Sequence, residues 1–495
     1  MPEEAAGRER DELDARRARL EHLRERGVEP FALSYSPDST AVELHRRYEG
    51  LGPETTTDDE IAVAGRIVLA RRFGKLAFFT LRDGTGDIQL FCLKEFLGDD
   101  AFELLEDLDL GDIVGARGVV MTTKKGELSV RVAELTLLTK SLRPLPEKWH
   151  GLRDEDLQQR LRYLQLASDP ESRSFVEARA GTLRTIRGYL DGRGFVEVET
   201  PVLQPVAGGA LAKPFTTHHD ALDADLKLRI SLELYLKRLL VGGIERIYEI
   251  GRTFRNEGLG TKYSPEFTML EAYQAYGDYS DMMRLAEDVV RESARAVRGT
   301  LRIPFRGREL DLEPAFRRIT VLGSVSEKLG EEIELDRTDL PAIAEKNDVH
   351  VDPAWGPGKI AQELFEKLVE ETLFEPTFVM DFPQEVSPLA RPHRDNPALT
   401  EHFDLVIGGI ELATAFSELT DPDDQRRRFE AQARAKTQGD EEAHPLDEDF
   451  LRALEHGMPP AGGIGIGIDR LLIVLTDAPS IRDVVSFPQL RPQEG

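Results

Sequence analysis

Five short stretches that alternate apolar and polar residues dominate the chain between residues 61 and 139. They read IAVAGRIVLARR, LAFFTLRD, DIQLFCL, DIVGARGVVMTT and ELSVRVAELTLLT. Alternation with a period of two is typical of β-strands, because successive side chains point to opposite faces. DGTG at 83–86 and KKG at 124–126 have the composition of hairpin turns. The sequence therefore predicts five strands in this region.

The segment KEFLGDDAFELLEDL, between the third and fourth strands, suits a helix. Five strands with one helix after the third is the order of an OB barrel, a common binder of single-stranded nucleic acid. The first thirty residues of the region are locally basic, with Arg66, Arg71, Arg72, Lys75 and Arg82 against Asp83 and Asp87. Phe78 could stack a base and Gln89 could read a base edge, although Phe78 taken alone is better explained as a core residue.

The length of 495 residues exceeds one ordinary domain. We expect a helical extension over 1–60, the barrel over 61–145, a linker over 146–172 and a second domain over 173–495. A net charge of −27 argues against a general nucleic-acid coat, but leaves room for a local RNA-binding surface.

Several classes of protein are disfavoured by composition. No apolar run approaches the roughly 18–20 residues that span a bilayer, and the charged N-terminus has no signal-peptide core. A single cysteine, Cys92, excludes an internal disulfide and a cysteine-rich zinc site. We therefore expect a cytoplasmic protein with no membrane segment.

The second domain contains a predicted hairpin with charged faces. From Ile247 to Glu257 alternate residues place Arg255 and Glu257 on one strand face. After the loop LGTKYS, Phe267 begins a second face that also carries Glu271. Arg255 and Glu257 could be an ordinary surface ion pair, or one wall of a ligand site.

A second arginine follows a glycine-spaced strand. The segment GGIGIGIDRLLIV, at 462–474, reads as a strand that runs into a helix, with Arg470 near the helix start. Free backbone N–H groups and the helix dipole favour phosphate at such a position.

Three motifs now stand in order along the chain. FRNE at 254–257 and GIGIDR at 465–470 resemble motifs 2 and 3 of the class II aminoacyl-tRNA synthetases, and GFVEVETPVL at 194–203 resembles motif 1. RPLPEKWHGL, GGALAKPF, ELYLKRLLVGG, PEFTMLEAY and ALEHGMPP resemble the lysyl-tRNA synthetases in particular. The resemblance covers residues 55–493. It implies an α+β fold, in which an OB barrel precedes a catalytic antiparallel sheet flanked by helices.

The resemblance implies that lysine and ATP form lysyl-adenylate, which then charges tRNA. Arg255 and Arg470 would be the catalytic cations on the phosphates. The ATP site would also contain Glu257, Tyr263, Phe267 and Glu411, and Mg²⁺ would bind Asp404 and Glu411. Arg72, Phe78 and Gln89 would bind the anticodon, and motif 1 with Pro201 would form a homodimer interface.

The choice of amino acid follows the sign of the pocket charge. The resemblance assigns the lysine site to Gly209, Glu233, Arg255, Glu271, Tyr273, Thr414 and Glu418. A buried ammonium needs carboxylates, whereas an aspartate pocket would need cations. Three glutamates and one phenol therefore favour lysine.

This chain departs from the family pattern at several positions. Tyr263 and Ser264 replace a usual His-Asn pair, Ile410 replaces an arginine, Thr414 an asparagine, and Asp404 a glutamate. The alternative is a paralogue that lysylates a non-tRNA acceptor or acts as a regulatory RNA-binding protein.

Overall fold

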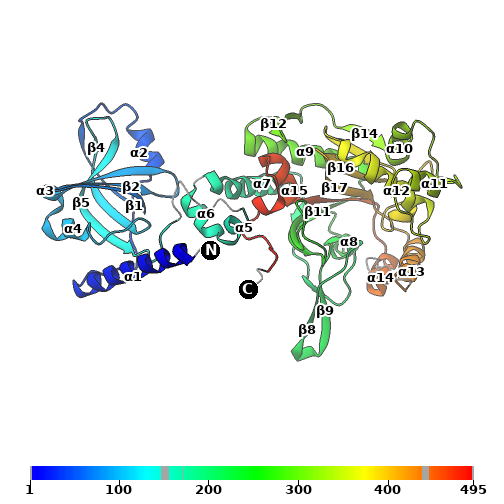
Figure 1. The fold of residues 1–495 in the computed structure, drawn as a ribbon. Coiled ribbons are helices and arrows are strands. Elements are labelled where there is room, and N and C mark those ends of the chain that lie inside the picture. Colours follow the sequence, from blue (N-terminus) through cyan, green and yellow to red (C-terminus); the bar gives the residue numbers. More distant parts are fainter. Residues whose placement is uncertain (1–2, 146–154, 170, 438–444, 493–495) are drawn as a thin grey trace. The chain divides into compact units, whose positions relative to one another are not determined.

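The computed structural model describes residues 3–145, 155–169, 171–437 and 445–492 (Figure 1). The chain divides into two compact units, Met1–Ser172 and Arg173–Gly495, which are described separately. Of the linker expected over 146–172, residues 146–154 and 170 lie outside the described ranges. In the rest, α5 (Glu155–Arg160) and α6 (Arg162–Ser168) are helical.

The first unit contains a closed five-stranded barrel with the order β1-β2-β3-β5-β4. The strands are β1 (Thr56–Phe73), β2 (Leu76–Arg82), β3 (Asp87–Leu93), β4 (Ile113–Thr122) and β5 (Leu128–Thr139). All neighbours are antiparallel except β3 and β5, and the barrel begins at Thr56 rather than at 61. This order confirms the predicted OB fold.

The helical insertion after β3 consists of two short helices rather than one. α3 (Lys94–Leu97) ends at Gly98, whose φ of 83° no helical residue adopts, and α4 (Asp99–Leu104) begins beyond it. Leu97 and Leu104 are buried in the barrel core. The apolar residues therefore place both helices as predicted, while glycine breaks the segment.

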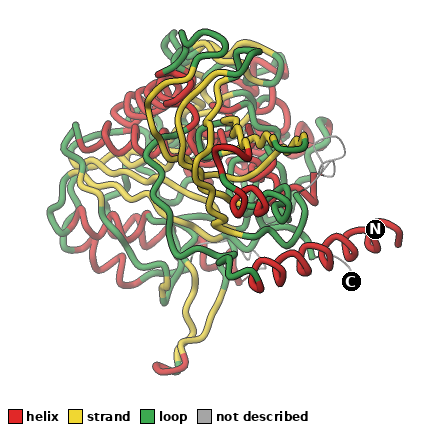
Figure 2. Tube along the Cα trace, turned by 90° about the vertical axis from the view of Figure 1, so that its left-hand side faces the viewer, coloured by secondary structure: helices red, strands yellow, loops and turns green. Residues whose placement is uncertain are grey.

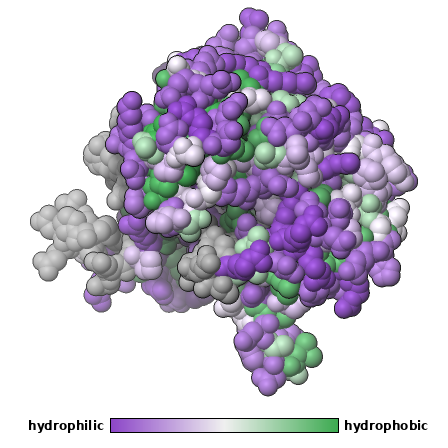
Figure 3. Space-filling view, turned by 90° about the vertical axis from the view of Figure 1, so that its right-hand side faces the viewer, coloured by the Kyte–Doolittle hydropathy of each residue, from purple (hydrophilic) through white to green (hydrophobic). Residues whose placement is uncertain are grey.

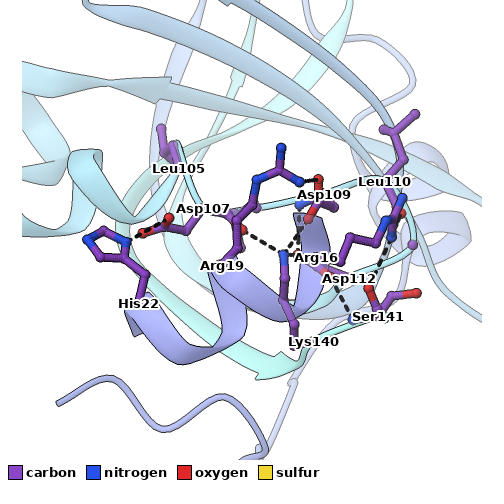
Figure 4. Close-up of polar contacts among 12 residues, drawn as sticks. Arg16, Arg19, His22, Leu105, Asp107, Asp109, Leu110, Asp112, Lys140 and Ser141 are labelled. Carbon is purple, nitrogen blue, oxygen red and sulfur yellow. Dashed lines mark hydrogen bonds and ion pairs between the residues drawn. The ribbon is translucent and has the colours of Figure 1, made fainter. Parts of the chain in front are cut away.

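Charge pairs hold the N-terminal helix α1 (Glu3–Glu25) to the barrel (Figure 4). Arg16 donates through Nη1 to the carbonyls of Leu110 and Ser141, at 3.0 Å each. The fully buried Lys140 lies beneath the helix, with Nζ 2.7 Å from Asp109 and 2.8 Å from Asp112. The helix has few apolar residues, but Leu20 and Leu23 are buried, so apolar packing and polar contacts together attach it to the barrel. A shorter helix, α2 (Ala41–Arg47), also packs on the barrel.

An eight-stranded sheet forms the centre of the second unit, with the order β14-β15-β16-β17-β18-β11-β10-β6. Its strands are β6 (Val196–Glu197), β10 (Arg246–Phe254), β11 (Glu266–Ala275), β14 (Arg317–Thr320), β15 (Thr377–Met380), β16 (His402–Ile407), β17 (Ile410–Ser417) and β18 (Ala461–Gly467). Pairing is antiparallel except at the two edges, where β6 and β14 lie parallel to their neighbours. This is the predicted antiparallel sheet.

Helices cover the sheet and build the main core. α7 (Ser174–Asp191), α9 (Tyr279–Arg298) and α15 (Ile468–Thr476) bury their apolar sides against one sheet face. The other helices are α8 (Glu233–Val241), α10 (Val321–Leu329), α11 (Leu340–Lys346), α12 (Pro357–Leu368), α13 (Pro422–Thr437) and α14 (Glu448–Glu455). No helix in the described ranges is long and apolar enough to cross a lipid bilayer.

Two smaller sheets complete this unit. β12 (Arg302–Phe305) pairs with β13 (Arg308–Asp311), and β9 (Ala224–Leu228) lies between β7 (Leu203–Gln204) and β8 (Thr216–His219). The β8–β9 hairpin projects from the unit as a narrow arm (Figure 2). The surrounding surface is largely hydrophilic, but the tip of this arm carries apolar side chains, among them the exposed Leu222 (Figure 3).

Candidate functional site

A pocket of about 390 Å³ opens on the sheet face opposite the main core. Alternation along β11 separates the two faces. Leu270 and Ala272 enter the core, whereas Glu271 and Tyr273 line the pocket. On β18, Ile464 and Ile466 are buried among core residues, and the glycines between them leave room on the pocket side. The strand pattern of the sequence thus builds both the core and the pocket wall.

The predicted hairpin is confirmed, but its first strand is shorter than expected. β10 and β11 pair with Glu249 opposite Glu271. The strand ends at Phe254, so the prediction that Arg255 and Glu257 share a strand face is wrong. The backbone leaves the ladder there because the N–H of Asn256 bonds the carbonyl of Lys213, at 2.7 Å. Arg255 and Glu257 nevertheless both line the pocket.

Arg255 and Arg470 bring two positive charges into this pocket. The guanidinium of Arg255 lies 5.1 Å from the ring centroid of Phe267, and its Nε donates to the carbonyl of Ile230 at 3.3 Å. Nη1 of Arg470 donates to the backbone carbonyl of Glu411 at 2.7 Å. Both arginines are therefore held in place before any ligand binds.

The helix start beneath Arg470 is itself anchored. Asp469 is buried, accepts a hydrogen bond from the backbone N–H of Thr268 at 2.8 Å, and pairs with Arg179 at 2.5 Å. Arg470 is the third residue of α15, as the sequence predicted. The link to β11 fixes where the helix dipole and the arginine point.

Tyr263 stands on the loop between β10 and β11 and is 54% exposed. Its ring lies 5.8 Å from the guanidinium carbon of Arg470. The neighbouring Lys262 donates through Nζ to the carbonyl of Gly409 at 2.9 Å. The loop that departs from the family pattern therefore places an aromatic ring next to Arg470.

The deep end of the pocket is acidic and closed to solvent. Oε1 of Glu271 accepts hydrogen bonds from Ser231 Oγ at 2.8 Å and from the N–H of Leu232 at 2.9 Å. Oε2 accepts one from the hydroxyl of Tyr273 at 3.0 Å. Burial and the nearby Glu233 carboxylate raise the pKa of Glu271 to about 7, and these three hydrogen bonds oppose the rise.

Glu233 and Glu418 are buried beside Glu271, so Glu233 is not an exposed helix-surface charge. Lys237 makes ion pairs with both, reaching Glu418 Oε2 at 2.5 Å. Burial and the neighbouring carboxylates raise the pKa of Glu418 to about 8, although Lys237 lowers it. Sequence reasoning missed Lys237, because a lysine four residues after a glutamate is typical of an exposed helix pair.

Two glycines allow the backbone to approach this acidic end. Gly209 has a φ of 91°, and a Cβ there would lie 2.9 Å from Ser231 Oγ. At Gly463, a Cβ would lie 2.0 Å from Oε1 of Glu418 and 2.4 Å from the Tyr273 ring. Sequence reasoning assigned Gly209 to the site, but treated Gly463 only as part of a strand pattern.

Asp404 and Glu411, the residues predicted to hold magnesium, line the pocket from neighbouring strands β16 and β17. Burial and the charges of Glu411, Glu366 and Asp404 raise the pKa of Glu370 to about 7. Negative charge is therefore concentrated beside these two carboxylates, and oxygen ligands suit Mg²⁺. Within the described ranges, no group of three or more His, Cys, Asp or Glu forms a ready-made metal site.

His402 joins two of the positions that depart from the family pattern. Its Nε2 lies 3.2 Å from the Asp404 carboxylate and 3.0 Å from the Thr414 hydroxyl. Nδ1 lies 2.7 Å from Ser387 Oγ, and the ring stacks on Phe382 at 4.1 Å. Sequence reasoning did not select His402, although it shares a strand face with Asp404. Ile410, another of these positions, is buried in the main core.

The residues predicted to bind an anticodon lie on the barrel strands. Phe78 is half-buried, lies opposite Phe91 at 5.4 Å between ring centroids, and carries the guanidinium of Arg71 at 5.6 Å. Gln89 is buried, accepts from Arg71 at 2.9 Å and donates to Ser129 Oγ at 2.9 Å. Arg72 donates to the backbone carbonyls of residues 105 and 108. Gln89 and Arg72 are thus already hydrogen-bonded within the barrel, whereas the side chain of Phe78 cannot form such bonds.

Comparison with known families covers both units. Residues 61–138 match the OB-fold nucleic acid binding domain, and residues 154–491 match the tRNA synthetases of class II (D, K and N). The second match alone spans more than half of the chain.

Full-length relatives narrow the assignment. A lysine–tRNA ligase of Moorella thermoacetica is 51% identical over 488 residues, which cover 98% of this chain and 99% of the relative. One from Thermosynechococcus vestitus is 51% identical over 481 residues, with 96% and 95% covered. One from Oceanobacillus iheyensis is 47% identical over 485 residues, with 97% and 98% covered. The chain therefore belongs to the class II tRNA synthetases for aspartate, lysine and asparagine, and within them to the lysine–tRNA ligases.

Proposed function

We propose that this chain joins lysine to tRNA in two steps: lysine and ATP form lysyl-adenylate and pyrophosphate, and tRNA then takes the lysyl group. One observation carries the proposal. A buried pocket end with three carboxylates continues into a region that holds Arg255 and Arg470. The acidic end suits the two ammonium groups of lysine, and the basic region suits its carboxylate and the phosphates of ATP.

The first step depends on positioning and charge neutralisation. The lysine carboxylate is ionised at pH 7, so it attacks the α-phosphate without a general base. Arg255 would bridge the carboxylate and the α-phosphate through its planar fork, and Arg470 would bind the γ-phosphate. Phe267 would stack on the adenine, and Glu257 would accept from the adenine amino group. The existing contact between Arg255 and Phe267 supports this arrangement.

Asp404 and Glu411 would hold Mg²⁺, which supplies positive charge to the phosphates when bound. The side chain of Asp404 is 19% exposed and that of Glu411 is 44% exposed, so both can reach a ligand in the pocket. Nη1 of Arg470 lies 3.2 Å from the Glu411 carboxylate, so the proposed magnesium and phosphate positions would be adjacent.

In the second step a ribose hydroxyl at the tRNA terminus attacks the lysyl carbonyl and loses its proton, the bond from the carbonyl carbon to the adenylate oxygen breaks, and AMP leaves. The barrel would bind the anticodon, with Phe78 stacking on a base. Gln89 and Arg72 are already hydrogen-bonded within the barrel, so their predicted roles require an exchange of partners or an indirect effect. The chain retains both the barrel and the two arginines, and so gives no support to a non-tRNA acceptor.

We also propose a homodimer built on motif 1, and a cytoplasmic site of action, where tRNA and ATP are available. Val196, Val202 and Leu203 flank Pro201 and are 51%, 38% and 45% exposed. Apolar side chains exposed along one short segment are typical of a protein interface.

The decisive experiment is ATP–pyrophosphate exchange with each of the twenty amino acids, followed by tRNA charging. We expect exchange with lysine and transfer to tRNA. Exchange that is absent, or that does not depend on lysine, would contradict the proposal. Arg255→Ala should abolish exchange while tRNA binding persists, and retained exchange would contradict the assignment of Arg255.

A further inference from the structure

Lys237 lies behind the acidic end of the pocket. It is one turn along α8 from Glu233, and its side chain is completely buried. Its ammonium pairs with Glu233 and with Glu418, at 2.5 Å from Oε2. Both carboxylates line the pocket, whereas Lys237 does not. Lys237 therefore contacts the two pocket carboxylates from behind, on the side away from the pocket.

Glu418 remains able to accept from a ligand. Within the described part of the chain, its Oε1 is buried and accepts no hydrogen bond. A buried carboxylate oxygen without a donor is costly, so this atom is suited to a donor that arrives from the pocket. Tyr273 and the backbone of Gly463 bound the same space.

The buried charges can now be counted. Glu233, Glu271 and Glu418 contribute three negative charges when all are ionised, and Lys237 contributes one positive charge. The remainder is two negative charges, which equals the number of ammonium groups on lysine. The ligand carboxylate is counted separately, because Arg255, which also lines the pocket, would pair with it.

The other groups around this cluster do not change the count. Ser231, Tyr273 and the N–H of Leu232 face Glu271 as neutral donors. Burial and neighbouring carboxylates raise the pKa values of Glu271 and Glu418, so a proton can balance either carboxylate when no ammonium group is bound. Lys237 stays charged, because its two carboxylates outweigh the effect of burial and raise its pKa.

We propose that Lys237 is the resident counterion of this pocket, and that by cancelling one of three buried negative charges it sets the ligand requirement at two positive charges. It is a positioning and specificity-determining residue, and it does not touch the substrate. The inference rests on the proposed function, since it takes lysine as the ligand. It explains why a site that selects a cation contains a buried cation of its own.

Paired charge changes test the count. Glu233→Gln lowers the number of positive charges that the pocket requires from two to one. Norleucine supplies one, its α-ammonium group, so the ratio of kcat/KM for lysine over norleucine in ATP–pyrophosphate exchange should fall about 100-fold. Lys237→Met raises the requirement to three, and the KM for lysine should rise by a similar factor. The double variant Glu233→Gln/Lys237→Met returns the count to two. It should recover most of the ratio and bring the lysine KM to within about tenfold of the wild type.

The matched control is Glu249→Gln. Glu249 is also buried and paired with an arginine, Arg229 at 2.6 Å, but it does not line the pocket. This change should lower the melting temperature without changing the lysine-to-norleucine ratio. If Lys237 had a purely structural role, the Glu233 variants would also show a lower melting temperature and an unchanged lysine-to-norleucine ratio.

Two results would overturn the inference. One is a wild-type ratio in Glu233→Gln, and the other is a double variant no better than Lys237→Met. If Lys237→Met fails to fold, the near-isosteric Glu233→Gln decides alone. If the charge of Lys237 did not count, two carboxylates would remain in this variant, so it would require two positive charges and keep its preference for lysine over norleucine. Failure of the proposed function itself would appear in the wild type, as exchange that does not depend on lysine.

Discussion

At the scale of single residues, the acidic end of the pocket is shaped as much by a missing side chain as by its carboxylates. Gly463 lies on β18 where the main chain passes Glu418 and Tyr273. The backbone can approach both groups only because no Cβ intervenes. We therefore expect selectivity for lysine to depend both on the buried charges and on the close approach of the Gly463 backbone.

Gly463→Ala should raise the KM for lysine about tenfold or more, because a methyl group at 2.0 Å from Glu418 Oε1 must displace the carboxylate. The KM for ATP should change little, since Phe267 and Arg470 lie toward the other end of the pocket. Steady-state exchange at varied lysine and varied ATP separates the two. Equal rises in both constants would indicate a general distortion of the sheet instead.

The acidic pocket also predicts how stability depends on pH. The folded pKa of Glu271 is about 7 against an ordinary value of 4.5, so the folded protein binds more protons between these values than the unfolded chain. The contribution of Glu271 to the free energy of unfolding is therefore fully present below about pH 4.5. It is lost as pH rises, by about 3 kcal/mol at pH 8. Glu418, with a folded pKa of about 8, extends the window upward.

Lysine should reverse this loss, because its ammonium groups favour the ionised carboxylates. We expect the rise in melting temperature caused by saturating lysine to grow from pH 5 to pH 8. The pKa of Glu370 is also raised to about 7, by burial and by the charges of Glu411, Glu366 and Asp404, so the contribution of this group should remain when lysine is bound. Thermal unfolding across this range, with and without lysine, measures the effect. A lysine-induced shift that does not vary with pH would contradict it.

At the scale of elements, the alternation of apolar residues predicted the barrel order and both faces of β11. It could not predict where β10 ends, because the bond from Asn256 to Lys213 joins segments far apart in the sequence. Nor could it place Lys237, whose burial comes from packing of α8 against the sheet. Local periodicity thus locates the pocket wall, and tertiary contacts decide which charges it encloses.

A substitution at His402 tests whether the side-chain contacts between β16 and β17 affect lysine binding. His402→Phe keeps a ring on Phe382 but removes the nitrogen that links Asp404 on β16 to Thr414 on β17. We expect about tenfold weaker lysine binding, because the Thr414 hydroxyl loses its anchor. Calorimetric titration with lysine alone, without ATP or magnesium, measures this directly.

The control is Ser387→Ala, which removes only the bond to Nδ1 of His402. It should weaken lysine binding less than His402→Phe, because the Nε2 contacts remain. Equal losses in the two variants would show that ring orientation, rather than the link between the strands, is what matters.

At the scale of the whole molecule, each unit has its own core. The barrel residues form one apolar cluster with α1 and α2, and the sheet with α7, α9 and α15 forms another. The acidic pocket and both arginines belong to the second unit, whereas Phe78 belongs to the first. This division predicts that the two chemical steps can be affected separately.

Phe78→Ala should leave lysine-dependent ATP–pyrophosphate exchange at its wild-type rate, because tRNA is not a reactant in that step. The KM for tRNA in the charging reaction should rise about tenfold to 100-fold, the effect of losing one base–aromatic stack of about 1–3 kcal/mol. Phe31→Ala removes an exposed aromatic ring elsewhere in the same unit and should leave the tRNA KM unchanged. Similar losses in both variants would assign the effect to barrel stability, whereas a selective loss in Phe78→Ala would place base recognition on the outer face of β2.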